Sequence, residues 1–307
     1  MSVAAVVVSF NRLDYLKKCL TALEEQTRPL DEIIVVENGS TDGSADYVRQ
    51  NHPGITLFET GANLGGAGGF AWGLELALKH GHSLAWLMDD DAEPRRDALG
   101  PLVAAMESEP RPGFAAPLVE DETGAVVQGN LPAVSTDANA QLVARKLGGI
   151  ALTHTTFVGA LVDLKLSAAM PLPYADFFIW FDDVEYTKRL ARTSFGIHVV
   201  EARMKHPNNA GKKDMGGRLY YYLRNQLWIT RLSPRPWSLT QRPLFRLAEL
   251  SVLALHQFKI AGNKRLWVSS TARGLAHGMF RTPAALQPGD LFATLPPEKR
   301  KQFGSRP

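Results

Sequence analysis

Between residues 3 and 115, short continuous apolar runs alternate with segments in which apolar residues recur at helical spacing. The continuous runs favour strands that are covered on both faces, and the spaced segments favour amphipathic helices. Strands are predicted at 3–10, 33–37, 55–59 and 84–88, and helices at 13–23, 45–50, 70–81 and 99–106. This alternation predicts an α/β fold with a Rossmann-like, mostly parallel sheet flanked by helices.

The pattern changes further along the chain. Residues 157–164 and 197–205 are predicted to form two more strands. Beyond residue 230 the sequence is basic and its periodicity is helical, so we place a domain boundary near Ser233–Pro234. The boundary divides the chain into an α/β domain, 1–232, and a basic helical C-terminal region with a loose tail, 233–307.

Composition narrows the classes of protein. The chain has 34 basic and 31 acidic residues and a net charge of +3, which gives no electrostatic case for nucleic acid binding. Cys19 is the only cysteine, so an intrachain disulfide is excluded and a reducing compartment is favoured. No run reaches the roughly 18 apolar residues of a spanning helix, and Met1 leads directly into an apolar run without a basic segment. These features predict a cytoplasmic protein.

Three unusual segments each follow a predicted strand: "NGSTDGS" at 38–44, "NLGGAGG" at 63–69 and "DDD" at 89–91. Parallel strands direct their carboxyl ends to the same edge of a sheet, and ligands bind beyond that edge. The three segments are therefore expected to be neighbours at a ligand-binding edge.

The triplet Asp89–Asp91 places three carboxylates side by side. One interpretation is a solvated acidic turn that ends the strand. The other is a site for a hard divalent cation such as Mg²⁺ or Mn²⁺, which prefers oxygen ligands. Because side chains alternate along an extended backbone, Asp89 and Asp91 are expected to point to the same side and Asp90 to the other.

A second acidic group lies in "FFIWFDDVEY", residues 177–186. Aromatic neighbours can raise the pKa of a carboxyl group, which suits Asp182 or Asp183 to general-base chemistry. The competing interpretation is a helix N-terminus, where acidic residues such as Glu185 favour the helix dipole.

Two further features are weaker. The glycines of 63–69 could let backbone N–H groups approach an anion, or they could form a flexible loop. The segment matches neither GxGxxG nor a P-loop, so dinucleotide binding and Walker-type chemistry are set aside. His206 follows a predicted strand; it is either a packing histidine or a further ligand for the aspartate site.

These motifs together resemble the family-2 glycosyltransferases of the GT-A fold. The resemblance rests on "VVVSFNR", "IIVVENGSTDGS", "NLGGAGGFAWG", "MDDDAEP" and "FFIWFDDVEYTKRL", which occur in that order within residues 3–230. The chain is most similar to bacterial galactofuranosyltransferases that build galactan on a lipid carrier. Rhamnosyltransferases of the same family are the second match.

The resemblance implies a role for each matching position. Many relatives carry Asp at the position of Glu37, and "YYYLRN" at 220–225 resembles a segment that follows the active site. The implied roles are a donor pocket with Ser9, Phe10, Arg12, Glu37, Asn63, Gly65, Gly66 and Asp90, a metal site with Asp89, Asp91 and His206, a general base Asp183 beside Asp182, and an acceptor side with Trp180 and Arg224.

The resemblance also implies the reaction. It is an inverting transfer, dependent on Mn²⁺ or Mg²⁺, of galactofuranose from UDP-galactofuranose to a hydroxyl of a lipid-linked glycan at the inner face of the cell membrane. The alternatives are a dTDP-rhamnose-dependent rhamnosyltransferase and an inactive sugar-nucleotide-binding module. Both acidic motifs are present, which favours the enzyme.

Residues 243–280 combine apolar and basic side chains and contain a single acidic residue, Glu249. Basic amphipathic helices with aromatic residues can lie on anionic membranes. We therefore expect either peripheral membrane contact, or a helical subdomain packed on the α/β domain, or a homo-oligomer interface.

Overall fold

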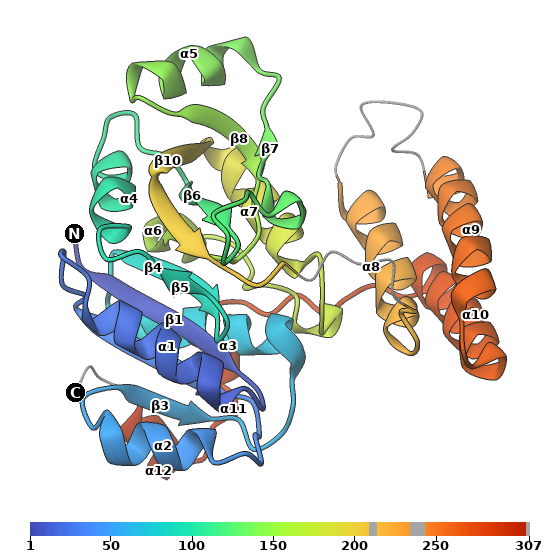
Figure 1. The fold of residues 1–307 in the computed structure, drawn as a ribbon, viewed down its shortest axis with the longest axis horizontal. Coiled ribbons are helices and arrows are strands. Elements are labelled where there is room, and N and C mark those ends of the chain that lie inside the picture. Colours follow the sequence, from blue (N-terminus) through green and yellow to red (C-terminus); the bar gives the residue numbers. More distant parts are fainter. Residues whose placement is uncertain (209–213, 234–242, 305–307) are drawn as a thin grey trace.

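The computed structural model describes residues 1–208, 214–233 and 243–304 (Figure 1). The strands are β1 (Val3–Ser9), β2 (Glu32–Glu37), β3 (Thr56–Glu59), β4 (Leu84–Asp89), β5 (Glu93–Pro94), β6 (Phe114–Glu120), β7 (Ala133–Val134), β8 (Ile150–His154), β9 (Ala160–Asp163) and β10 (Gly196–Lys205). The helices are α1 (Leu13–Glu24), α2 (Ser44–Asn51), α3 (Gly65–Lys79), α4 (Leu99–Met106), α5 (Ala138–Lys146), α6 (Leu164–Ser167), α7 (Asp182–Thr193), α8 (Arg218–Leu232), α9 (Pro243–Ile260), α10 (Lys264–Phe280), α11 (Asp290–Thr294) and α12 (Pro297–Gln302), with short 3₁₀ turns η1 (Gln128–Asn130) and η2 (Ala175–Phe177).

The strands form one sheet in the order β3-β2-β1-β4-β9-β6-β10-β8-β7, and β5 pairs with β10. The first four strands in this order are parallel, as the strand–helix alternation predicts. The sheet is mixed beyond β4, because β9 enters between β4 and β6 in the opposite direction. The predicted α/β fold is confirmed, and the parallel arrangement is restricted mainly to its N-terminal half.

Both faces of the sheet are covered, and every residue of β1 is buried. Val3 and Val7 pack in the cluster that contains Leu16 and Leu20 of α1, whereas alternate residues of the strand pack toward α3 on the other face. This two-sided burial explains why the strand sequence is continuously apolar instead of alternating.

Helix α3 begins earlier than the sequence predicts. The glycine-rich segment was expected to form a loop up to residue 69, but the helix starts at Gly65. A Cβ atom at Gly69 would lie 2.4 Å from Val8 Cγ1, and one at Gly73 would lie 2.1 Å from Val6 Cγ1. The glycines therefore let the helix lie directly on β1, and this packing outweighs their low helix propensity.

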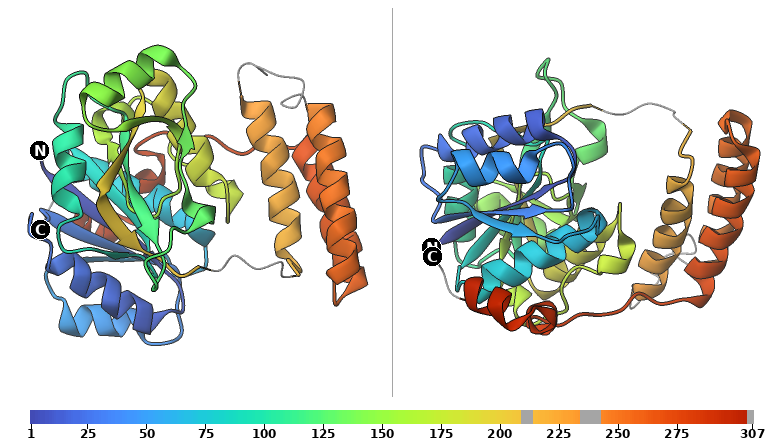
Figure 2. Two further views of the ribbon diagram at one scale, coloured as in Figure 1. Left: turned by 45° about the horizontal axis from the view of Figure 1, so that its top comes forward. Right: turned by 90° about the horizontal axis from the view of Figure 1, so that it is seen from below.

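Helices α8, α9 and α10 form a separate group beside the sheet (Figures 1 and 2). Their apolar contacts include Leu219, Leu223 and Leu227 of α8 with Leu250 of α9. The predicted domain boundary near Ser233–Pro234 therefore separates α8 from α9 and α10, against which α8 packs. The boundary remains a prediction from composition. Pro234 itself lies outside the described residues. Among the helices that the structure describes, none is long and apolar enough to span a membrane.

The C-terminal segment is not the loose tail that was predicted, apart from residues 305–307, which lie outside the described part of the chain. It runs back to the sheet domain (Figure 2), where α11 lies against α3 and Lys299 of α12 reaches the Glu59 carbonyl oxygen at the end of β3. Leu295 and Phe303 are buried, and the Phe303 ring meets the Phe58 ring edge-on at 5.2 Å. The backbone N–H groups of Gly289 and Phe292 donate to the buried Glu75 carboxylate.

A buried polar cluster also anchors this segment. Glu32 Oε2 lies 2.6 Å from His82 Nε2, and Glu32 Oε1 lies 3.0 Å from His80 Nδ1. His80 Nε2 is 3.1 Å from the Phe303 carbonyl oxygen. Because both nitrogens of His80 face acceptors, the ring satisfies them by donating from both, as an imidazolium. Burial opposes ionisation of Glu32, but the hydrogen bonds from His80 and His82 outweigh it and lower its pKa.

We predict that Glu32→Ala lowers the free energy of unfolding by about 3–5 kcal/mol, because it leaves a buried imidazolium without its carboxylate. Urea denaturation followed by circular dichroism measures this change. The control is Glu25→Ala at an exposed position, for which we expect a change within about 0.5 kcal/mol. Equal stabilities of the two variants would contradict the role given to the cluster.

Candidate active site

The carboxyl ends of β1, β2 and β4 meet at one edge of the sheet (Figure 1). In the parallel register, Ser9 of β1 lies opposite Glu37 of β2, and Val8 of β1 lies opposite Asp89 of β4. The polar segments that follow these strands are therefore neighbours, as the sequence predicts.

The triplet Asp89–Asp91 is contacted by the loop after β1. Asp90 Oδ2 accepts a hydrogen bond of 3.0 Å from the backbone N–H of Phe10. Arg12 Nη1 contacts Asp91 Oδ2 and lies 3.4 Å from Asp90 Oδ1. The two aspartates are buried, whereas the Arg12 side chain is 47% exposed. The guanidinium thus neutralises part of the acidic charge from the solvent side.

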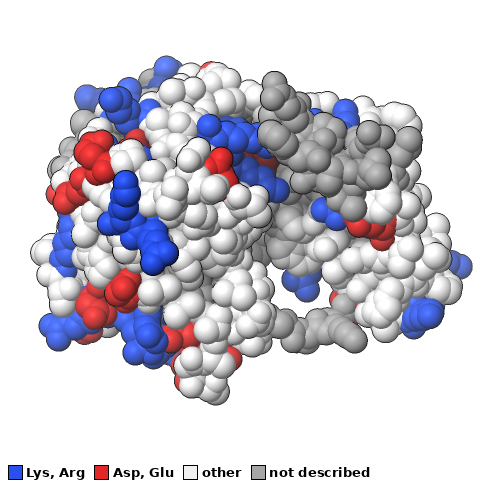
Figure 3. Space-filling model, turned by 90° about the horizontal axis from the view of Figure 1, so that it is seen from above, with Lys and Arg blue, Asp and Glu red and all other residues white. Residues whose placement is uncertain are grey.

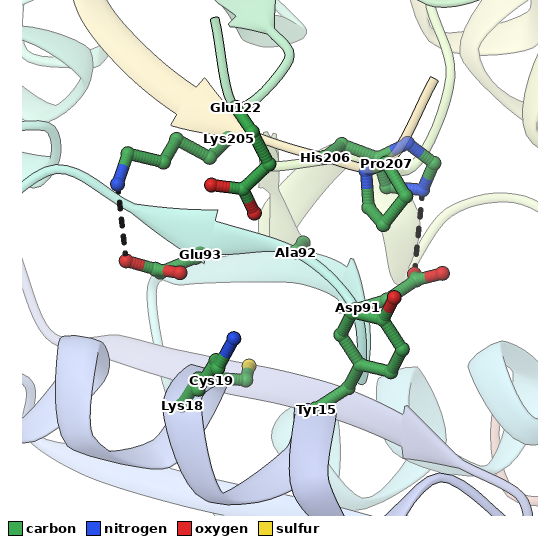
Figure 4. Close-up of a pocket in the computed structure, with 10 residues that line it drawn as sticks. All are labelled: Tyr15, Lys18, Cys19, Asp91, Ala92, Glu93, Glu122, Lys205, His206 and Pro207. Atoms are coloured by element: carbon green, nitrogen blue, oxygen red, sulfur yellow. Dashed lines mark hydrogen bonds and ion pairs between the residues drawn. The ribbon is translucent and has the colours of Figure 1, made fainter. Parts of the chain in front are cut away.

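His206 lies across from the triplet, directly after β10. Its Nε2 is 3.3 Å from Asp91 Oδ1, and the two side chains point toward one another beside Tyr15 (Figure 4). The backbone N–H of His206 donates to the carbonyl oxygen of Glu120, so the sheet fixes the position of the histidine. Ligand atoms of Asp89, Asp91 and His206 all lie within 4.8 Å of one another, so the structure brings together the three residues that the sequence proposes as metal ligands.

Burial of several like charges alters their protonation. Burial, reinforced by the two neighbouring aspartates, raises the pKa of Asp89 to about 7. Burial raises the pKa of Asp90 to about 6, although the hydrogen bond from Phe10 N–H opposes this. Burial lowers the pKa of His206, but its contact with Asp91 outweighs that effect, and the net shift is upward. Such a cluster gains stability from an added cation.

Two groups of described residues have the composition of a metal site: Asp89, Asp91 and His206, and the buried Glu32, His80 and His82. Metal–nitrogen bonds of about 2.0–2.1 Å in tetrahedral geometry separate two ligand atoms by roughly 3.3 Å. The 2.6 Å between Glu32 and His82 is instead a hydrogen-bond distance. The oxygen-rich first group suits Mg²⁺ or Mn²⁺, and its carboxylates carry the charge that such an ion neutralises.

The second pair of acids begins α7. Burial, with contributions from Asp183 and Asp89, raises the pKa of Asp182 well above its usual range. Burial raises the pKa of Asp183 to about 6, although backbone N–H groups, including that of Val184, hydrogen-bond the carboxylate and oppose the shift. Asp89 contributes to this upward shift of the Asp182 pKa, so the two acidic motifs lie within electrostatic reach of each other.

The segment before α7 has an unusual backbone. Phe178, Trp180 and Phe181 have positive φ angles of 63°, 65° and 72°. Non-glycine residues in such regions cost on the order of 1–3 kcal/mol each and persist only where surrounding contacts hold them. The two aspartates therefore follow directly after a strained stretch of chain.

The residues expected on the donor side lie around the same edge. Glu37 is buried, and its carboxylate accepts hydrogen bonds from the backbone N–H of Ser40 at 2.6 Å and of the preceding residue at 3.1 Å. Asn63 Oδ1 accepts one from the backbone N–H of Gly65 at 2.8 Å. Gly65 is buried, and Gly66 is partly exposed. Glu37 and Asn63 thus shape the two loops, and their contacts with a donor remain predictions.

The two residues predicted on the acceptor side differ in exposure. Trp180 is partly exposed, and the guanidinium of Arg218 lies over its ring at 5.6 Å. Arg224 is buried, and its Nη2 donates to the carbonyl oxygens of Asp176 and Phe177. An acceptor contact by Arg224 remains a prediction.

Arg224 also lines a cavity of about 460 Å³. The cavity lies between α3, η2 and α8, and its lining includes Asn63, Trp72, Phe178 and Tyr221. It is therefore bounded by the donor loop on one side and by the strained segment on another.

Sequence reasoning missed Asn225. Its side chain is fully buried and donates to the carbonyl oxygens of Phe177, Ile179 and Trp180. The signal available was its place in "YYYLRN", where only the neighbouring arginine was singled out.

Comparison with known proteins agrees with this geometry. The family model described as Glycosyl transferase family 2 matches residues 4–158. Galactofuranosyltransferase GlfT1 of Mycobacterium tuberculosis (strain ATCC 25618 / H37Rv) is 35% identical over 224 residues, which are 67% of this chain and 70% of that protein. N-acetylglucosaminyl-diphospho-decaprenol L-rhamnosyltransferase of the same organism is 29% identical over 129 residues, 39% of this chain and 42% of that protein.

Solved structures share the fold. S. aureus TarS 1–349 matches with a TM-score of 0.60 and 14% identity, over 91% of this chain and 81% of that one. Mannosyltransferase PcManGT from Pyrobaculum calidifontis, solved with GDP-Man and Mn²⁺, matches with a TM-score of 0.54 and 19% identity, over 98% of this chain and 82% of that one. The GT-A fold is thus confirmed, and the chain is a glycosyltransferase that belongs to glycosyl transferase family 2.

Proposed function

We propose that this glycosyltransferase transfers galactofuranose from UDP-galactofuranose to a hydroxyl of a lipid-linked glycan, with inversion at the anomeric carbon. The observation that carries the reaction type is the presence of two acidic motifs, the Asp89–Asp91 triplet at the end of β4 and the Asp182–Asp183 pair at the start of α7, with Asp89 contributing to the raised pKa of Asp182. The triplet would hold a cation that stabilises the leaving diphosphate, and the pair would supply a base for the attacking hydroxyl.

On the donor side, Asp89, Asp91 and His206 would hold Mn²⁺ or Mg²⁺. The ion, when bound, supplies positive charge that stabilises the departing diphosphate. Ser9 and Glu37 end the adjoining strands side by side, and the nucleotide of the donor would bind beside them. Arg12 is half-exposed beside the triplet, so its guanidinium can turn from the aspartates to the donor phosphates.

On the acceptor side, Asp183 would take the proton of the attacking hydroxyl. Its pKa of about 6 leaves it ionised at neutral pH while keeping it an effective base. Burial also raises the pKa of Asp182 well above its usual range, which disfavours a second negative charge beside the base. Trp180, partly exposed at the start of the same segment, offers an aromatic face for a sugar ring.

Two alternatives are kept in the test. The rhamnosyltransferase relative matches a smaller share of this chain, 39% against 67% for the galactofuranosyltransferase, which favours galactofuranose. An inactive sugar-nucleotide-binding module would bind donor without turnover.

We would incubate the enzyme and Mn²⁺ with a lipid-linked disaccharide and UDP-galactofuranose, UDP-galactopyranose or dTDP-rhamnose. Transfer from UDP-galactofuranose alone supports the proposal, whereas transfer only from dTDP-rhamnose, or from none, contradicts it.

The helical region supports a place of action at the membrane. Val252 and Leu255 on α9 are 68% and 61% exposed, and Phe280 at the end of α10 is 85% exposed. Uncharged side chains predominate on the face of this region shown in Figure 3, with Lys and Arg at its outer edge and a small group of basic and acidic side chains beside the grey segment. We include peripheral contact with an anionic membrane in the proposal, because the acceptor is carried on a lipid. The other expected role of these helices, a homo-oligomer interface, is an alternative outcome of the test below.

The metal site generates one prediction. Asp89→Ala and Asp91→Ala should each remove the Mn²⁺-dependent part of UDP binding while the protein stays folded, because each variant deletes a ligand. Calorimetric titration of UDP with and without Mn²⁺ measures this. Asp97→Asn, an exposed nearby aspartate, serves as the control and should bind like the wild type. Metal-dependent affinity that survives in both alanine variants would contradict the site.

The general base generates a second prediction. Asp183→Asn should keep donor binding but lower kcat by about a hundred- to ten-thousand-fold, because it removes the proton acceptor with little change in shape. In the wild type, kcat should be constant above pH 7 and fall as the pH drops through about 6, where Asp183 gains a proton. Steady-state rates between pH 5 and 8 test both statements. More than a tenth of the wild-type rate in the variant would place the base elsewhere.

The third prediction concerns the membrane. Wild-type protein should float with anionic vesicles at low salt and be released at high salt, because each basic residue near the bilayer contributes about 1 kcal/mol. The double variant Val252→Asp/Leu255→Asp should lose flotation. Its matched control is Val134→Asp/Leu142→Asp on the sheet domain, at positions 57% and 61% exposed, which should float like the wild type. The membrane contact is ruled out if the wild type does not float, or if both double variants float equally. If the wild type instead dimerises through α9, these helices form an oligomer interface.

A further inference from the structure

Segment 177–181 lies between the cavity that Phe178 and Arg224 line and the two aspartates that begin α7, and part of its backbone has positive φ angles. Three of its residues, Phe178, Trp180 and Phe181, have positive φ, which L-residues with large side chains rarely adopt. The next two residues are Asp182 and Asp183. Any relaxation of this segment would therefore move or rotate the carboxylates that follow it.

Asn225 of α8 supplies a restraint. Its Nδ2 group lies 2.9 Å from the carbonyl oxygens of Phe177 and Ile179 and 3.0 Å from that of Trp180. The amide orientation is fixed by Arg224, whose Nε donates to Asn225 Oδ1 at 2.9 Å. The NH₂ group must then face the segment, where it donates hydrogen bonds to the carbonyl groups of the residues on either side of the strained Phe178.

Arg224 adds to this restraint. Its Nη2 donates to the carbonyl oxygens of Asp176 and Phe177, and its Nη1 donates to the Tyr220 hydroxyl. The guanidinium also lies 4.2 Å from the centre of the Trp228 ring. With 7% of the residue exposed, its donors are used within the protein.

The other side of the segment rests on the glycine-rich start of α3. A Cβ atom at Gly65 would lie 2.0 Å from the Phe178 carbonyl oxygen, so only glycine fits there. The Ala67 N–H donates to the same oxygen at 3.3 Å, and Asn38 Nδ2 donates to the Gly65 carbonyl oxygen at 3.0 Å. The segment is thus held between the donor-side loops and α8.

We propose that Arg224 and Asn225 are positioning residues that hold segment 177–181 in its strained form and so place the Asp183 carboxylate for catalysis. This inference rests on the proposed role of Asp183 as the general base. It gives "YYYLRN" a function without contact to substrate. It also explains why a helix that packs with the C-terminal group carries buried polar side chains toward the active site.

The test uses Asn225→Asp, which keeps the shape but turns the donor into an acceptor, and Arg224→Lys, which keeps the charge but loses the forked geometry. Both should lower kcat at least tenfold, with the Kd for UDP and Mn²⁺ and the KM for acceptor within about twofold of the wild type. The matched control is Leu223→Ala, a fully buried residue in the apolar cluster of α8 and α9, which should lower the Tm but keep kcat within about twofold. If Arg224 instead bound the acceptor, Arg224→Lys would raise the acceptor KM, which would overturn the proposal.

A double variant separates this inference from the proposed function. If Asn225 acts through Asp183, Asp183→Asn/Asn225→Asp should be no slower than Asp183→Asn alone. If the reductions in kcat of the two single variants multiply in the double variant, the positioning role is overturned. A wild-type kcat in Asn225→Asp would overturn it as well. Failure of the general-base assignment would appear separately, as an active Asp183→Asn enzyme. Where Asn225→Asp does not fold, the same comparison is made with Arg224→Lys.

Discussion

The concentration of carboxyl groups at one edge of the sheet is the constraint around which the rest of the structure is arranged. The Asp89–Asp91 triplet and the Asp182–Asp183 pair come from segments far apart in sequence, and burial raises the pKa of several of them. Such a cluster is unfavourable unless cations and donors face it. Arg12, His206 and backbone N–H groups do so here.

A second requirement is close approach between elements. Gly65 allows α3 to touch the segment before α7, while glycines one and two turns later allow the same helix to lie on β1. The donor-side loops, the strained segment and α8 therefore form a continuous stack, with Asn225 at one end. Rigid packing of this kind is how a fold keeps two reactive groups at a fixed separation. If Asn225 positions Asp183 as proposed, the helical group is part of the catalytic structure, even though it stands apart from the sheet.

Much of this could be predicted from sequence, and the failures have physical causes. The strands and helices up to residue 106, apart from the two-residue β5, follow from local apolar periodicity, which needs no partner. The early start of α3 could not be predicted, because it depends on contact with valines some sixty residues earlier, against the propensity of glycine. The docked C-terminal segment was missed because sparse anchors such as Phe303 lie among basic residues. Asn225 was missed because a lone amide in a helix carries no local signal; its role exists only where the strained segment meets it.

The central claim is that the edge of the sheet binds a divalent ion between the triplet and the histidine. Crystals grown with UDP and Mn²⁺ and measured at the manganese absorption edge test it directly. The account predicts an anomalous peak about 2.0–2.6 Å from Asp89, Asp91 and His206, with the diphosphate completing the coordination. An anomalous map with no peak there, or with its peak at Glu32, His80 and His82, would contradict it.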